Sequence, residues 1–238
     1  MKKIAVIPAR YAASRFPGKL LKPLGDKTVI AHTYLATLHT GLFDEVLVAT
    51  DSDDIKTEIE HYGGSVYMSG VLHESGSDRI AEAIKNRDVD IIVNVQGDTP
   101  FVNGVSLKKL VDLFLDEPVQ IGSLMEIIKD DISLNDPNVV KVSVDNQMNS
   151  LLFSRSVIPY PRNTDEKITH YKHIGVYAFR KEILLRFTKW PVTPLENAEK
   201  IECLRFLENG IQLKMALTES MGIDINSPED LQRAQALL

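Results

Sequence analysis

Short runs of β-branched residues alternate with helix-length amphipathic stretches through the first half of the chain, and this alternation limits the possible folds more than any other feature. Four runs lack the polar alternation of a half-exposed strand: residues 4–7, 46–49, 66–68 and 91–95. Strands of that kind lie in sheets with helices on both faces. Helical spacing is found between them, at 29–38, at 55–62 and from Ser77 onwards. The pattern predicts an α/β fold with a Rossmann-like, mostly parallel sheet flanked by helices.

The second half of the chain has a different pattern of apolar and polar residues. Apolar and polar residues alternate over 139–144, Asp145-Asn146 has the composition of a turn, and 150–154 is suited to return as a hairpin strand. A length of 238 residues suits one α/β domain with an insertion. We therefore predict a single domain over 1–238, in which roughly residues 120–180 form an antiparallel insertion.

Local signals predict the remaining elements. Two prolines followed by polar residues predict a loop over 158–165. Periodicity predicts a helix over Leu195–Leu207 and a strand over Ile211–Met215, and Pro228 is suited to the first turn of a last helix.

Charge and composition exclude several classes of protein. The chain has 27 Lys+Arg against 33 Asp+Glu, a net charge of −6, which argues against a protein that coats nucleic acid or an anionic membrane. The apolar run at 4–7 ends at Pro8, too early for a signal peptide, and no stretch is long enough to be a membrane helix. The single cysteine, Cys203, excludes an intramolecular disulfide and a thiolate-rich zinc site, and its neighbours in sequence favour a packing role. We expect a cytoplasmic protein.

In doubly wound sheets, ligands bind beyond the carboxyl ends of the strands, so polar residues there are the first candidates for function. The connection after the first strand contains the cations Arg10, Arg15 and Lys19, together with Ser14 and Gly18. Guanidinium and ammonium groups beside a glycine suit phosphoryl oxygens. The alternative is a solvated basic loop, because the Walker spacing is absent.

Acidic and amide side chains follow later strands. Asp98 comes soon after the fourth strand, and one such carboxylate is an adequate anchor for Mg²⁺ against a triphosphate. Asp224 and Asn226 point the same way if their segment is extended, which makes them candidate partners for Asp98. The alternatives are a turn role for Asp98 and a helix cap at Asn226 or Ser227.

Two more segments contain candidate binding residues. Ser75 and Arg79 lie in a polar stretch that runs into a helix, whose N-terminal amides suit a nucleotide base or an anion; a simple helix cap is the alternative. Strand alternation places His173, Gly175 and Tyr177 on one face, where the glycine leaves room for a ligand. A structural histidine is the alternative there.

Glu199 and Glu202 are three residues apart on the helix predicted over Leu195–Leu207, so they share a face. A solvated acidic surface is the simplest interpretation of that face.

Six motifs lie in these segments: I-P-A-R-Y-x-x-S-R-x-P-G-K at 7–19, V-A-T-D at 48–51, S-G-x-D-R at 75–79, V-N-V-Q-G-D-x-P at 93–100, F-S-R-x-x-I-P at 153–159 and K-H-x-G-V-Y at 172–177. With all six, the chain resembles the cytidylyltransferases that activate acidic sugars, in particular those that act on 3-deoxy-manno-octulosonate (Kdo). The resemblance spans nearly the whole chain. Sialic acid cytidylyltransferases are not expected to contain the last two motifs together.

The resemblance implies a role for each candidate residue. The CTP site would be formed by Arg10, Ser14, Arg15, Lys19, Ser75, Arg79 and Gln96. The sugar-acid site would be lined by Gln96, Arg155, His173, Tyr177, Glu199 and Glu202. Asp98 would bind Mg²⁺, the implied cofactor, and Lys19, Arg15 and Asp98 would be the catalytic residues. A homodimer is also implied, with its contact in the insertion.

The chain departs from the family pattern in two places. Where the family often has V-D-x-P-E-D, residues 225–230 are I-N-S-P-E-D, so that the second metal carboxylate would be Asp224, with Asn226 beside it. Where the family commonly has L-E-Q-L-R, residues 201–205 are I-E-C-L-R, so that Cys203 replaces an amide suited to the sugar.

The predicted reaction converts CTP and Kdo to CMP-Kdo and diphosphate, for lipopolysaccharide synthesis. Transfer of this kind depends on placement and electrostatics, and no protein nucleophile is evident in the sequence. Two alternatives remain open. The acceptor is 8-amino-Kdo or sialic acid in one, and the chain is a non-catalytic nucleotide-binding regulator in the other.

Overall fold

The computed structural model describes residues 1–11, 16–71, 73, 75–163, 168–219 and 221–238. Within these residues, one sheet has the strand order β11-β7-β10-β6-β1-β4-β5. Its strands are β1 (Lys3–Ala9), β4 (Glu45–Thr50), β5 (Ser65–Met68), β6 (Ile91–Asn94), β7 (Ile121–Ile127), β10 (Tyr171–Arg180) and β11 (Lys214–Leu217). The pairs β1–β4, β1–β6, β4–β5 and β7–β11 are parallel, whereas β10 is antiparallel to both of its neighbours, β6 and β7. The predicted α/β fold with a mostly parallel sheet is confirmed.

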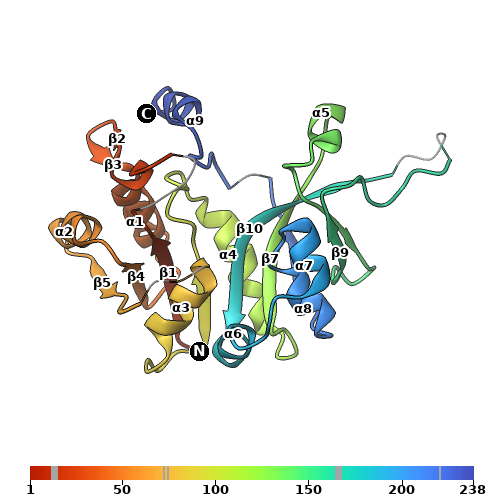
Figure 1. Ribbon diagram of the computed structural model, residues 1–238, viewed down its shortest axis with the longest axis horizontal. Coiled ribbons are helices and arrows are strands. Elements are labelled where there is room, and N and C mark those ends of the chain that lie inside the picture. The colour runs from red at the N-terminus through yellow and green to blue at the C-terminus, as the bar shows by residue number, and fades with distance from the viewer. Residues whose placement is uncertain (12–15, 72, 74, 164–167, 220) are drawn as a thin grey trace.

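Helices cover both faces of this sheet (Figure 1). They are α1 (Val29–His39), α2 (Asp53–His61), α3 (Gly76–Ile84), α4 (Gly104–Asp112), α5 (Asp131–Asn135), α6 (Lys181–Phe187), α7 (Pro194–Glu199), α8 (Leu204–Glu208) and α9 (Pro228–Gln235), with short 3₁₀ turns η1 (Lys19–Leu21) and η2 (Leu113–Leu115). A small pair, β2 (Pro23–Leu24) and β3 (Lys27–Thr28), precedes α1.

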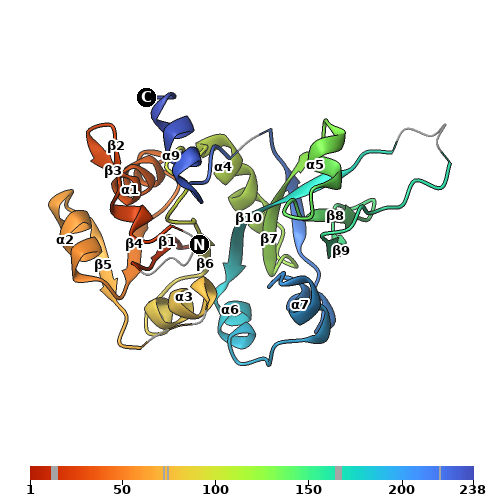
Figure 2. The ribbon, with the colours of Figure 1, turned by 45° about the horizontal axis from the view of Figure 1, so that its top comes forward.

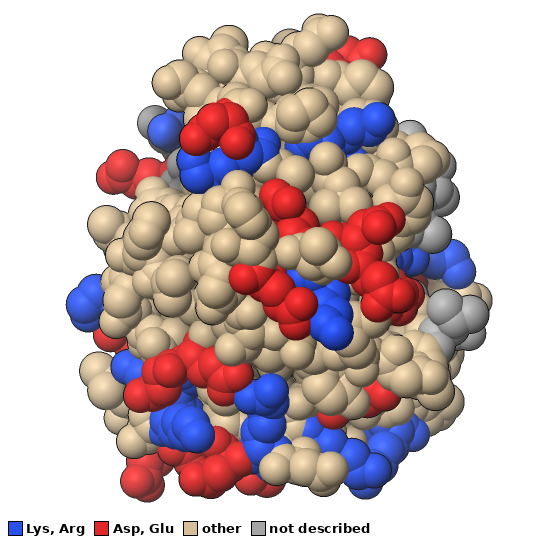
Figure 3. Space-filling view, turned by 90° about the vertical axis from the view of Figure 1, so that its left-hand side faces the viewer, with Lys and Arg blue, Asp and Glu red and all other residues tan. Residues whose placement is uncertain are grey.

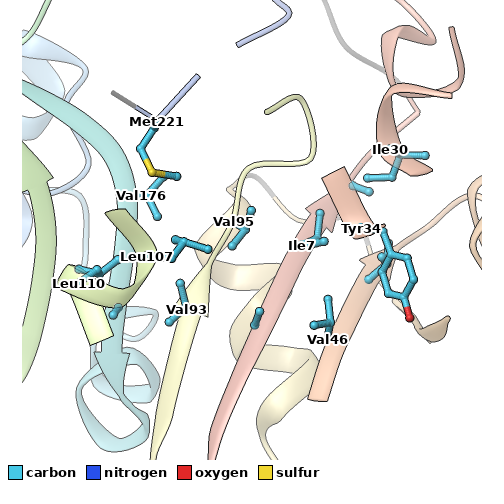
Figure 4. Packing of buried hydrophobic residues seen from close by; sticks show 14 of the residues in the cluster. Ile7, Ile30, Tyr34, Val46, Val93, Val95, Leu107, Leu110, Val176 and Met221 are labelled. Carbon is cyan, nitrogen blue, oxygen red and sulfur yellow. The ribbon is translucent and has the colours of Figure 1, made fainter. Parts of the chain in front are cut away.

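The alternation of side chains along β1 explains why residues 4–7 are all apolar. Ala5 and Ile7 belong to the core cluster on the side of α1 and α4, whereas Ile4 and Val6 belong to the cluster on the side of α3 and α6. All four side chains have no exposed surface, because both faces of the sheet are covered. Figure 4 shows the first cluster at the centre of the sheet.

The antiparallel part is built around β10. The hairpin β8 (Lys141–Val144) and β9 (Ser150–Ser154) pairs through β8 with β10, as the alternation over 139–144 predicts. Residues 155–163, after β9, extend away from the body of the molecule (Figures 1 and 2). The structure of a single chain does not test whether residues 120–180 form a dimerisation subdomain, so that assignment stays a prediction.

Two predicted elements are wrong in their bounds. The helix expected over Leu195–Leu207 is two short helices, α7 and α8, because Lys200 has a positive φ of 54° and ends α7 in the left-handed conformation. The strand expected over Ile211–Met215 begins only at Lys214, since its partner is the first part of β7, at Gly122.

No described helix has the length and hydropathy needed to cross a bilayer. On the face beyond α2 and β5, acidic and basic side chains are interspersed (Figure 3). That face has no broad cationic area suited to a polyanion.

Candidate active site

A cavity of about 190 Å³ lies where β1 and β6 end and α3 begins. Its lining residues are Pro8, Ala9, Arg10, His73, Ser75, Gly76, Arg79 and Gln96. Five of the residues predicted for the nucleotide are described, and four of them, Arg10, Ser75, Arg79 and Gln96, are brought together here. The fifth, Lys19, is not among the lining residues. His73 was not predicted, although it stands two residues before Ser75 in the same connection.

Two of these residues also stabilise the wall of the cavity. The Arg79 guanidinium is 4% exposed and donates to the Ala9 carbonyl at 3.0 Å and to the Asp51 carboxylate at 2.8 Å. Arg79 beside it lowers the pKa of Asp51, so the pair is charged. Ser75 caps α3, its Oγ accepting the Asp78 N–H at 3.1 Å, so the cap alternative is correct and Ser75 still faces the cavity.

Lys19 contacts Asp98, which follows β6, and Ile225 near the C-terminus, so it joins two distant parts of the chain. Its ammonium forms an ion pair with Asp98, donates to the Ile225 carbonyl at 2.8 Å, and lies 3.3 Å from Asn226 Oδ1. The preceding Gly18 has a φ of 67°, a conformation that favours glycine and lets the chain turn into η1. Asp98 and Asn226 therefore meet as the sequence predicts, whereas the contact of Lys19 with both of them was not predicted.

Asp224 is the second carboxylate at this place. Its Oδ1 accepts the Thr99 hydroxyl at 2.6 Å, and burial together with the nearby charge of Asp98 raises the pKa of Asp224. Gly222 makes the approach possible, because its φ is 102° and a Cβ would lie 2.6 Å from the Phe101 carbonyl oxygen. Met221, packed near Val176 in Figure 4, anchors the same segment in the core.

The donor set at Asp98, Asp224 and Asn226 fits Mg²⁺. Two carboxylates and an amide are hard oxygen ligands, and a few such ligands plus phosphate oxygens and water satisfy this ion. Burial is the main cause of the raised pKa of Asp224, and the negative charge of Asp98 adds to it, so a cation beside both carboxylates would relieve part of this cost. Within the described ranges, no cluster of three or more His, Cys, Asp or Glu residues suited to a metal is found, so the site would need oxygen atoms from a ligand.

A second cavity, of about 370 Å³, lies beside β10. One wall is formed by Lys172, His173, Gly175 and Tyr177 of β10, and the others by residues 138–140 and 200–202. The predicted face of His173, Gly175 and Tyr177 is thus real, and a Cβ added at Gly175 would meet nothing within 4 Å.

The two cavities adjoin. Gln96 lines the first cavity, and its Nε2 donates to the carbonyl of Gly175 at 3.3 Å. Gly175 lines the second cavity. On the other side, Ser77 of α3 donates to Glu202 Oε2 at 2.9 Å. The lining of the first cavity is therefore hydrogen-bonded directly to that of the second through Gln96, and α3, which forms part of the first lining, is bonded to the second through Ser77.

Glu202 presents an unsatisfied acceptor at this boundary. Its Oε1 is buried and has no hydrogen-bond partner in the part of the chain that the structure describes. Burial raises the pKa of Glu202. A buried carboxylate oxygen without a donor is costly, so the residue is suited to a ligand that brings a hydroxyl or ammonium group.

Arg155 and Glu199 lie behind the second cavity and are not among its lining residues. Arg155 Nε donates to the Glu199 carbonyl at 2.6 Å, and the Arg155 N–H donates to the Glu199 carboxylate at 2.9 Å. Glu199 and Glu202 do not share a helical face, because the chain turns at Lys200 between them. Ser14 and Arg15 lie outside the described residues, so their roles stay predictions.

Cys203 is 1% exposed and belongs to the core, which confirms its packing role. Burial raises the pKa of the Cys203 thiol, so the group is not a thiolate at neutral pH. Tyr177 hydrogen-bonds to it, and burial raises the pKa of Tyr177 as well.

His173 makes the stability of the protein depend on pH. Burial lowers the pKa of His173 to about 4, against about 6.5 in an unfolded chain. Between these values the unfolded chain binds a proton that the folded protein does not, so the free energy of unfolding falls as the pH falls through that window. His173 is only half-buried, and we therefore expect it to contribute a loss of about 2 kcal/mol from pH 7 to pH 4.5.

Urea unfolding from pH 4.5 to pH 7.5 measures this effect. The His173→Gln variant should show a shallower pH dependence than the unmodified protein. Gln232→Ala, at an exposed position of α9, is the control: it removes no titratable group and should leave the dependence unchanged. Equal slopes for all three proteins would contradict the prediction.

Comparisons with known proteins agree with this geometry. The sequence model of the cytidylyltransferase family matches residues 4–218. This chain belongs to the cytidylyltransferase family. Over 241 residues, covering 100% of the chain, this cytidylyltransferase is 53% identical to a 3-deoxy-manno-octulosonate cytidylyltransferase of Flavobacterium johnsoniae, 99% of which is covered. It is also 41% identical to an 8-amino-3,8-dideoxy-manno-octulosonate cytidylyltransferase of Shewanella piezotolerans, with 100% of this chain and 99% of the relative covered.

A solved structure extends the comparison to three dimensions. A CMP-2-keto-3-deoxy-manno-octonic acid synthetase in complex with CTP has a TM-score of 0.95 to this cytidylyltransferase at 36% identity, with 100% and 98% of the two chains covered. Another cytidylyltransferase, from Leptospira borgpetersenii, has a TM-score of 0.67 at 19% identity, which shows a shared fold alone.

Proposed function

We propose that this enzyme transfers the cytidylyl group of CTP to 3-deoxy-manno-octulosonate and releases diphosphate. The observation that carries the proposal is the adjacency of the two cavities across Gln96 and Ser77–Glu202. Group transfer between two substrates requires them to be bound side by side with their reacting atoms close together. The relative from F. johnsoniae, named for this reaction, matches the chain from end to end.

In the proposed reaction, the anomeric hydroxyl of the sugar attacks the α-phosphorus of CTP, the bond to the β-phosphate oxygen breaks, and diphosphate leaves. The first cavity holds CTP, with Arg10 as a cation for its phosphates and the N-terminus of α3 beside it. Lys19 is placed to neutralise charge on the same phosphates. These residues bind and position, and none forms a covalent bond with the substrate.

Mg²⁺ is the proposed cofactor, held by Asp98 and Asp224 with Asn226 beside them, and when bound it would neutralise charge on the phosphates. The Thr99 hydroxyl donates to the Asp224 carboxylate and orients it. The 2.9 Å hydrogen bond from the Ile225 N–H to the Asp98 carbonyl holds the two segments together.

The second cavity suits an acidic, polyhydroxylated sugar. Lys200 supplies positive charge for a carboxylate at its rim, whereas the Lys172 ammonium is paired with the Glu126 carboxylate at 3.1 Å. Glu202 Oε1 accepts from a hydroxyl. Neutral His173, whose Nε2 lies 2.9 Å from Ser123 Oγ, adds a ring that is polar but uncharged.

Diphosphate release by the purified protein with Mg²⁺ and CTP tests the function. Kdo, 8-amino-Kdo, sialic acid and no acceptor are compared. Release with Kdo alone is the expected result. A preference for 8-amino-Kdo or sialic acid would replace the proposed acceptor, and CTP binding without release with any acceptor would favour the non-catalytic regulator.

We further propose that the enzyme is a cytoplasmic homodimer. Residues 155–163, after β9, project from the body, and Tyr160 among them is 81% exposed, which favours a contact between two copies there. Light scattering of the purified protein would give twice the chain mass, and Tyr160→Ser should weaken that association.

A further inference from the structure

Lys141, the first residue of β8, is completely buried although it bears an ammonium group. The ammonium donates to the backbone carbonyls of Asp136, Val139 and Arg155, each at 2.8 Å. A lysine has three donors, so the whole hydrogen-bonding capacity of the group is used on backbone. A buried cation with a complete set of acceptors fixes the relative position of every segment that supplies one.

Arg155 extends the same network. Its Nη1 donates to the Pro137 carbonyl at 2.8 Å and its Nε to the Glu199 carbonyl at 2.6 Å. The Glu199 carboxylate, in turn, accepts the Ser154 hydroxyl at 2.7 Å. Lys141, Arg155 and Glu199 form what we term the backing network, which ties residues 136–139 to residues 199–200.

The segments held by the backing network are the walls of the second cavity. Residues 138–140 form one side of it and residues 200–202 another, and both lie outside helices and strands. Besides the network, residues 138–140 are held to β10 by the hydrogen bond from the His173 N–H to the Val140 carbonyl at 2.8 Å. The distance between the two walls therefore depends on side chains behind them.

The first cavity has no such dependence. Its lining comes from β1, from α3 and the residues before it, and from Gln96 after β6, and no residue of the backing network is among them. A change at Lys141 would therefore alter the two cavities unequally.

We propose that Lys141 is a positioning residue for the sugar acceptor: by holding three backbone carbonyls behind the second cavity, it sets the separation of the walls that recognise the acidic sugar, without touching the sugar and without affecting CTP. This inference rests on the proposed function, in which the second cavity is the acceptor site. It also gives Arg155 and Glu199 a positioning role in place of the sugar contacts that the family resemblance implies.

The test uses Lys141→Met, which keeps the length of the side chain and removes its donors. We expect the KM for Kdo to rise about tenfold or more, because small displacements of binding groups have large effects, while the KM and the calorimetric Kd for CTP stay within about twofold. Lys181→Met is the matched control. Lys181 also donates from a partly buried ammonium to a backbone carbonyl, that of Arg87, but it follows the last residue of β10, at the end of that strand away from the second cavity.

The control should lower thermal stability without changing the KM for Kdo. Equal rises in both KM values for Lys141→Met, or a lowered Tm with an unchanged KM for Kdo, would overturn the inference. If Lys141→Met does not fold, Lys141→Gln, which retains two N–H donors, is measured in the same way and judged by the same split between Kdo and CTP.

Hydrogen exchange separates this inference from the proposed function. A failure of the proposed function appears in the unmodified protein, as absence of diphosphate release with Kdo. The inference is judged independently in the variant without substrates, where faster amide exchange confined to residues 138–142 and 199–202 is expected. Unchanged exchange in these segments would overturn it.

Discussion

Replacing Asp98 by asparagine is expected to lower kcat/KM for diphosphate release by about 100-fold or more while the protein remains folded. Asp98 is ion-paired with Lys19, whose ammonium also contacts Asn226. Burial and the negative charge of Asp98 together raise the pKa of Asp224. An asparagine retains the shape and removes the charge on which both the proposed cation and the ammonium of Lys19 depend. Stability should change little, because the lost attraction to Lys19 is opposed by the lost repulsion of Asp224.

The measurement is diphosphate release at saturating Mg²⁺, with circular dichroism and Tm as checks on the fold. Asp116→Asn is the matched control, because Asp116 is exposed and precedes β7 at the edge of the sheet opposite the site. It should leave kcat/KM within about twofold. Unchanged turnover in Asp98→Asn would remove Asp98 from the catalytic site.

Replacing Glu196 by alanine is expected to lower the free energy of unfolding by about 3–5 kcal/mol, the largest effect on stability that we predict. Glu196 is 7% exposed and accepts from Arg205 Nε at 2.7 Å and from Nη2 as well. Arg205 is 9% exposed, and its guanidinium carbon lies 4.3 Å from the centre of the Phe187 ring. Removing the carboxylate alone leaves this charge buried without its partner.

Urea unfolding at pH 7 measures this loss, with two comparisons. Asp112→Ala breaks the Lys108–Asp112 pair, whose side chains are 62% and 44% exposed, and should cost less than about 1 kcal/mol. The double variant Glu196→Leu/Arg205→Met removes both charges and should recover much of the stability. A cost for Glu196→Ala as small as that for Asp112→Ala would show that the buried pair contributes nothing beyond a surface pair.

The sheet could be predicted because its signals are local. Each residue of β1 between Ile4 and Ile7 is apolar, since alternate side chains enter different core clusters. The break at Lys200 could not be predicted, because the apolar spacing continues from Ile201 to Leu204 and a positive φ at a lysine has no signature in the sequence.

The site could be predicted as a set of strand ends but not as a set of contacts. The rule that parallel strands end at one edge was sufficient to bring Arg10, Gln96 and Asp98 to the same region. It could not show that the Arg79 guanidinium is bonded to Asp51, or that Arg155 is turned toward backbone carbonyls. Those partners lie 28 and 44 residues away in the chain, and only the packing of the elements decides them.

The attachment of α9 has a consequence for how relatives of this chain are judged from genome sequences. Asp230 Oδ2 accepts the N–H groups of Asn226 and Ser227, each at 2.9 Å, so the first turn of α9 sets the backbone that presents Asp224 and Asn226 to Lys19. A gene that encodes every motif up to Asn226 but stops before Asp230 would pass a motif search. Its product would lack the clamp on the candidate metal ligands, so an intact final helix is a better criterion of a competent gene than the motifs alone.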